Sequence, residues 1–136
     1  MPARDVARVL AAGRIAIGVS LLAAPRFALG MWIGRSAASP AVGPVGRALG
    51  AREVLLGAMA LHTLDRPQVA ARWLRMLAAC DAVDLAATVA VRRELPGYGR
   101  ALIVAMASAG AGGQLWAAQE IAAGTAEQRP DAPAAG

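Results

Sequence analysis

Four apolar segments, each about as long as a membrane-crossing helix, constrain this chain more than any other feature. They span residues 6–24, 45–64, 68–91 and 101–123. A helix needs roughly 20 predominantly apolar residues to cross a bilayer, and each segment meets that length. Only the last holds a long uncharged run, ALIVAMASAGAGGQLWAAQ. The pattern predicts an all-α fold, a four-helix transmembrane bundle within residues 1–124.

The stretches between the segments carry residues that favour turns. AAPRFALGMWIGRSAASPAVGP holds three prolines, LDRPQ makes a tight connection, and RRELPGYGR joins the last two segments. Within the first stretch, residues 26–33 are a candidate short interfacial helix. The tail, residues 125–136, is polar and rich in proline and alanine, so it is predicted to be disordered.

Composition supports a membrane location without requiring it. The chain is 57% hydrophobic and 17% charged, whereas soluble domains are usually about a quarter charged. Charges interrupt three of the four segments, so four soluble amphipathic helices remain an alternative. The first segment also has features of a secretory signal. Arg14 splits its apolar centre, however, and three more apolar segments follow, which favours an uncleaved span.

Several function classes lack the residues they need. The net charge is +5, but the arginines are scattered and form no basic stripe with aromatic residues, so no nucleic-acid partner is expected. One cysteine and one histidine exclude an internal disulfide, a Cys-rich zinc site and a two-histidine metal centre. No phosphate-binding glycine loop or nucleophile motif is present. The sequence therefore predicts no metal and no cofactor.

The charged residues inside the segments are the candidate site. A charge at mid-bilayer costs about 2.5–3.5 kcal/mol, so such groups are expected to face other helices and to pair. Arg75 does not share a face with the acids and is expected to point elsewhere. The predicted buried polar network consists of Arg14, Arg52, Glu53, Asp81 and Asp84.

Helical spacing indicates which of these groups point inward. Glu53 shares a stripe with three glycines, which lets a second helix approach closely. Asp81 and Asp84 share one face of their segment, and Arg14 shares a face with Gly18 and Leu21. If residues 45–91 form an antiparallel hairpin, Arg52 and Asp81 lie at similar depth, because the rise per residue is constant. Arg52 is therefore predicted to bridge Asp81 and Glu53.

Three stretches resemble a known group of proteins: GRIAIGVSLLAAPRFALGMWIG, RALGAREVLLGAMAL and RWLRMLAACDAVDLAAT. They are similar to small four-helix integral membrane proteins of actinobacteria, and more distantly to DoxX-type membrane proteins in architecture. The likeness extends to Gln119. It implies a four-span bundle with Arg52, Glu53, Asp81 and Asp84 in its interior, and it implies no activity.

These observations favour a small multi-pass protein of a bacterial cytoplasmic membrane, with both termini on one side. Its orientation stays open because the arginines divide almost evenly between the two sides. The expected function is binding of a ligand or partner, or service as an accessory subunit, through the buried network. The alternatives are a membrane-embedded isomerase or cyclase using Asp81, Asp84 or Glu53 as acid or base, and a small oligomeric transporter. A purely structural ion-pair network is the simplest reading. The expected partners are the lipid bilayer and a second copy or another membrane protein.

Overall fold

The computed structural model describes residues 1–127, and all of the regular structure in that range is helical. The elements in chain order are α1 (Ala3–Ala23), α2 (Pro25–Ile33), the 3-10 helix η1 (Gly34–Ala38), α3 (Val42–Thr63), α4 (Pro67–Ala90) and α5 (Gly97–Glu127). The all-α prediction is confirmed. Each long helix covers one predicted apolar segment, with ends that differ by a few residues.

The largest differences in boundaries lie at the two ends of α5, which begins at Gly97 rather than residue 101 and ends at Glu127 rather than residue 123. Residues 125–127 were predicted to belong to the disordered tail, yet the helix continues through Glu127. Alanine and glutamate are good helix formers, so the helix runs on past the last large apolar residue. The rest of the predicted tail, residues 128–136, lies outside the described residues.

Proline and glycine set several of the helix ends. Pro25 and Pro67 occupy the first positions of α2 and α4, where a missing N–H removes no helical hydrogen bond. Gly34 follows α2 with a φ of +58°, a conformation that glycine adopts without the steric penalty of a Cβ. The short helix predicted over residues 26–33 is thus present as α2. Gly34 turns the chain into η1.

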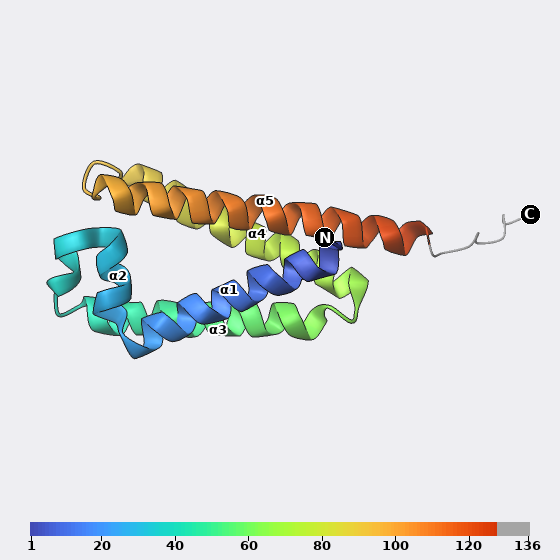
Figure 1. Ribbon diagram of the computed structural model, residues 1–136, viewed down its shortest axis with the longest axis horizontal. Coiled ribbons are helices and arrows are strands. Elements are labelled where there is room, and N and C mark those ends of the chain that lie inside the picture. Colours follow the sequence, from blue (N-terminus) through green and yellow to red (C-terminus); the bar gives the residue numbers. More distant parts are fainter. Residues whose placement is uncertain (128–136) are drawn as a thin grey trace, which may run out of the picture.

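The four long helices are arranged as two antiparallel pairs (Figure 1). α1 packs most extensively along α3, and α4 packs along α5, while contacts between the two pairs are fewer. The start of α1 and the end of α5 lie at the same end of the molecule, and α2 with η1 covers the opposite end (Figure 1). Helices adjacent in the sequence, α3 and α4, are therefore not the main partners of each other.

Glycines bring α1 and α3 unusually close. A Cβ built on Gly18 would lie 2.6 Å from the carbonyl oxygen of Gly50. One built on Gly57 would lie 2.8 Å from the carbonyl oxygen of Ala11. Small residues on both faces let the two backbones touch, which maximises van der Waals contact where large side chains are absent.

The interior differs between the two ends of the molecule. Toward the termini the helices enclose a continuous core made mainly of alanine and leucine: Ala7, Ala11, Ala60, Leu64, Ala70, Ala71, Leu74, Leu77, Ala117, Ala118 and Ile121. Toward α2 the two helix pairs separate and leave a cavity, described below. The core is thus filled toward the termini, and the cavity lies between this core and α2.

We predict that Gly50→Ala destabilises the protein and that Gly112→Ala does not. The new Cβ at position 50 would lie 2.7 Å from the Gly18 carbonyl oxygen and 2.9 Å from the Leu22 backbone nitrogen. Such overpacking costs about 1–3 kcal/mol. A Cβ at Gly112, which is also helical, would meet nothing within 4 Å, and alanine favours the helix by up to about 1 kcal/mol. Thermal unfolding followed by circular dichroism checks the pair. Equal stability of both variants would contradict the close packing.

Candidate functional site

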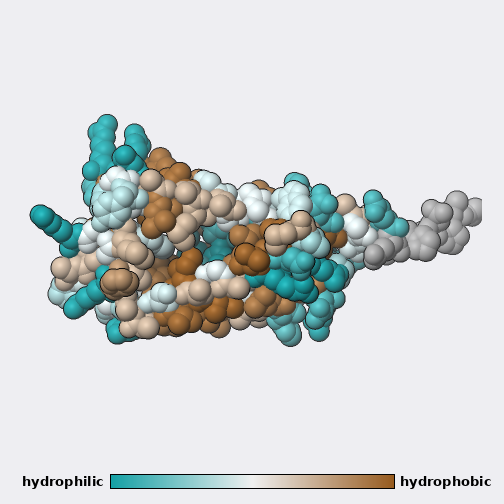
Figure 2. All heavy atoms as spheres, viewed as in Figure 1, coloured by the Kyte–Doolittle hydropathy of each residue, from teal (hydrophilic) through white to brown (hydrophobic). Residues whose placement is uncertain are grey.

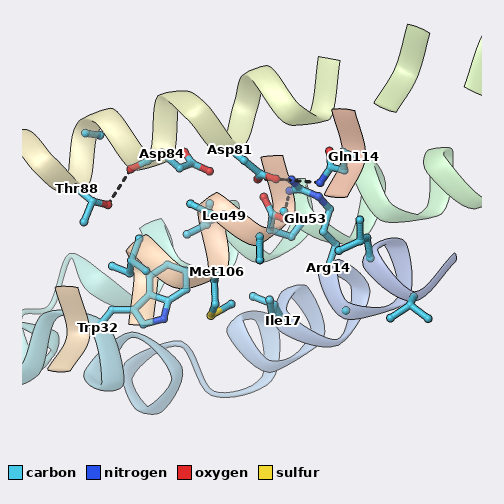
Figure 3. A pocket seen from close by; sticks show the side chains of 18 residues that line it. Arg14, Ile17, Trp32, Leu49, Glu53, Asp81, Asp84, Thr88, Met106 and Gln114 are labelled. Atoms are coloured by element: carbon cyan, nitrogen blue, oxygen red, sulfur yellow. Dashed lines mark hydrogen bonds and ion pairs between the residues drawn. The ribbon is translucent and has the colours of Figure 1, made fainter. Parts of the chain in front are cut away.

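Arg14 lies at the centre of the charged cluster (Figure 3). It extends from α1 and is 7% exposed. Its Nη1 donates to Oε2 of Glu53 on α3 at 2.5 Å, and its Nη2 donates to Oδ1 of Asp81 on α4. One guanidinium therefore binds two buried carboxylates from two other helices. The planar fork of arginine suits this role, because it presents several donors in fixed directions.

The neighbouring helices have small residues where the cluster needs room. On α5, Gly110 faces Asp81, and a Cβ there would lie 2.5 Å from Oδ2 of that carboxylate. One turn further along, Nε2 of Gln114 donates to the same oxygen at 2.9 Å. Asp81 thus receives donors from α1 and α5, so all four long helices contribute a residue or a close contact to this layer.

Burial makes the charges of this layer costly unless they are paired. A charge that is removed from water needs a partner and further hydrogen bonds to offset the desolvation. Glu53 and Asp81 are both under 10% exposed, and each has that partner in Arg14. Within residues 1–127, two buried polar atoms of the layer have no protein partner, Nε of Arg14 and Oε1 of Gln114. The network is therefore well paired in charge but incomplete in hydrogen bonds.

Arg52 and Asp84 form a second, looser pair beside the first. Nη1 of Arg52 lies 3.6 Å from Oδ1 of Asp84, and the two side chains are 38% and 43% exposed. Arg52 was predicted to bridge Asp81 and Glu53, and the structure gives that role to Arg14 instead. Arg52 was predicted to lie at the depth of Asp81, and its position along α3 agrees with that. It lies on the flank of α3, however, whereas Glu53 lies on the glycine stripe that faces α1.

The structure therefore brings together only three of the five predicted residues in a buried cluster. Arg14, Glu53 and Asp81 are buried, while Arg52 and Asp84 are half-buried. The expectation for Arg75 holds, because this residue is exposed on α4, away from the acids. Gln114 was not predicted, because a neutral amide within an apolar run carries no charge that has to be paired. Its position one turn after Gly110 was the available signal.

A cavity of about 440 Å³ adjoins the cluster on the side toward α2. Its walls are mainly apolar, and Asp84, Thr88 and the Arg14 cluster supply the polar surface (Figure 3). The apolar and small lining residues are Val9, Leu10, Gly13, Ile17, Trp32, Leu49, Ala87, Ile103, Met106, Ala107, Ala109 and Gly110. In the space-filling view a hollow opens in the middle of one face, with hydrophilic surface at its base (Figure 2). Within residues 1–127, no three His, Cys, Asp or Glu side chains converge as metal ligands.

No protein-family model, curated protein or solved structure matches this chain. The resemblance to actinobacterial four-helix membrane proteins stays a prediction. The cavity and the charged cluster are therefore the features that bear on function.

We predict that Arg14→Met strongly destabilises the protein, whereas Arg8→Met leaves it nearly unchanged. Loss of Arg14 strands two buried carboxylates, and breaking a buried pair this way costs about 3–5 kcal/mol. Arg8 pairs with Asp5 on the surface, with both side chains half-exposed, and such pairs contribute about 1 kcal/mol or less. The measurement is the midpoint of denaturant unfolding. Adding Glu53→Gln and Asp81→Asn to Arg14→Met should restore part of the loss, because the stranded charges are then removed. No recovery would mean that Arg14 acts through packing rather than charge.

Proposed function

We propose that this protein is a multi-pass integral membrane protein of a bacterial cytoplasmic membrane that binds a small amphiphilic ligand in its central cavity. The observation that carries the proposal is the cavity itself. It combines mainly apolar walls with a few polar groups at one end, which is the usual make-up of a small-molecule site.

The helices support the membrane location. Among the described helices, α1 and α5 are long and apolar enough to cross a bilayer by length and composition. We propose that α3 and α4 cross as well, since their 22 and 24 residues give lengths of about 33 and 36 Å at ~1.5 Å per residue. Glu53 and Asp81, which lie in the middle parts of these helices, are turned inward, as charges within a membrane are expected to be.

The surface supports the same location. Hydrophobic residues cover much of the middle of the molecule, and hydrophilic residues gather at its two ends (Figure 2). Arg75 is the exposed charge nearest the middle of α4, and its long side chain can reach the boundary with water. The exposed apolar side chains include Val19, Leu55, Met59, Met76, Val83 and Leu115. These side chains come from all four long helices, as a lipid-facing surface requires.

The shape of the cavity indicates how a ligand is oriented. Its volume of about 440 Å³ falls in the usual range for sites that enclose small molecules, roughly 300–1,000 Å³. The apolar body of the ligand would lie between Ile17, Trp32 and Met106. Its polar end would face Asp84 and the Arg14 cluster.

A membrane-embedded acid–base enzyme, such as an isomerase or cyclase, is the second candidate. It is favoured by Asp84, a half-exposed carboxylate in the same cavity, which is suitably placed for proton transfer to a bound molecule. Mass spectrometry of small molecules extracted from the purified protein separates the two candidates. A binding protein returns the added ligand unchanged, whereas an enzyme returns an isomer.

We predict that the protein stays in the membrane fraction after an alkaline carbonate wash and is released by detergent. Peripheral proteins are stripped by the wash, whereas membrane-spanning helices are held by their buried apolar surface. Immunoblotting of the pellet and supernatant gives the answer. Recovery of a compact monomer from detergent-free buffer would overturn the membrane location.

We predict that Gly13→Phe blocks the cavity and Gly112→Phe does not. Both glycines are exposed in helices, and a Cβ at either meets nothing within 4 Å, but only Gly13 lines the cavity. A suitable probe is 1-aminoanthracene, whose fluorescence rises in apolar surroundings. The saturable part of its binding to purified protein should fall at least about tenfold with Gly13→Phe, because the added ring occupies the ligand volume. Identical binding by both variants would place the ligand elsewhere.

A further inference from the structure

The charges around the cavity do not balance. The two ion-paired groups together contain three carboxylates, Glu53, Asp81 and Asp84, and two guanidinium groups, Arg14 and Arg52. With all five ionised, the site carries one excess negative charge. An uncompensated charge is expensive in surroundings of low dielectric constant, so a site of this kind favours a positive guest.

We infer that the ligand of this cavity is a monovalent organic cation with an apolar body, such as a substituted amine, and that Asp84 binds its charged end. This inference rests on the proposed function and names the chemical class of its ligand. A bound cation brings the charge of the site to zero.

Asp84 has the most exposed side chain of the three carboxylates. Arg14 already donates to Glu53 and Asp81, and Gln114 donates to the second oxygen of Asp81. The Asp84 carboxylate lies 3.6 Å from Arg52, beyond ordinary hydrogen-bond distance. Its side chain is 43% exposed and lines the cavity. It therefore has both the access and the free acceptor positions to receive a ligand.

A second observation points to a ligand of the same polarity. Gln114 lines the cavity and is 2% exposed, and within the described residues its Oε1 has no hydrogen-bond donor. A buried carbonyl oxygen of this kind is satisfied by an N–H group or attracted to a positive charge. The other unpartnered atom, Nε of Arg14, is a donor, but it belongs to a guanidinium that already binds two carboxylates. An anionic ligand would still face repulsion from those carboxylates and from this oxygen.

The opposite wall suits the body of such a cation. Trp32 and Met106 lie across the cavity from Asp84 (Figure 3). The indole offers a large apolar surface, and the thioether of methionine adapts to apolar shapes. The site thus offers a carboxylate on one side and an aromatic ring on the other.

The test compares two molecules of the same shape, benzyltrimethylammonium and neopentylbenzene, which differ only in the replacement of a charged nitrogen by carbon. Each is titrated calorimetrically into the purified full-length protein in an uncharged detergent, with detergent alone as the blank. The cation should bind at least about tenfold more tightly than the neutral molecule. Asp84→Asn should abolish that advantage, and Asp84→Glu should keep it. Asp65→Asn is the matched control, because it removes the same charge from an exposed turn away from the cavity.

Each other outcome has a defined meaning. Equal binding of both molecules, still blocked by Gly13→Phe, would overturn the cation inference and leave the amphiphile-binding function standing. A cation preference that survives Asp84→Asn would overturn the assignment of Asp84. Failure of both molecules to bind a protein with native circular dichroism would overturn the proposed function as well.

Discussion

The buried guanidinium of Arg14 forms ion pairs both within one half of this molecule and across to the other half. α1 and α3 form one closely packed pair and α4 and α5 form the other, with fewer contacts between the pairs. Arg14 belongs to the first pair and binds Glu53 within it, and it also reaches across to Asp81 in the second. Because the partners are buried, the link fixes the rotation and height of each helix rather than merely adding attraction. The cavity lies directly beside this link, so its polar end is set by the same residues that hold the pairs together.

The division into a filled core and a cavity follows from side-chain size. Toward the termini, the core consists mainly of alanines with a few leucines, and the helices pack closely there. Beyond the Arg14 layer, α2 crosses the far end and Trp32 lines the cavity, so the pairs do not close onto each other. In the proposed membrane setting, packing rather than water exclusion stabilises the filled core. The cavity therefore forfeits packing energy, and a bound ligand would restore those contacts.

The sequence predicts the helices better than their partners. Segment length and the flanking prolines and glycines define each helix, and the glycine stripe correctly turns Glu53 inward. The depth argument places Arg52 at the level of Asp81, but depth fixes only the position along a helix axis. It assumes that consecutive helices pair, whereas α3 pairs mainly with α1. Neighbours in space depend on the fit of whole faces, which no local pattern encodes. For the same reason Gln114 becomes visible only when α5 is placed against Asp81.

The excess carboxylate is hard to explain by stability alone. Glu53 and Asp81 both form ion pairs with Arg14. Removing Asp84 would leave a site with two acids and two arginines, which is neutral without a bound ligand. Asp84 is also less buried than the others and faces the cavity rather than the core. A site with one acid more than it has arginines, at the wall of a cavity large enough for a small molecule, departs from local consistency. Such departures tend to concentrate at functional sites. In the proposed function the Arg14 layer forms the buried end of the site, and Asp84 is the carboxylate that the ligand reaches.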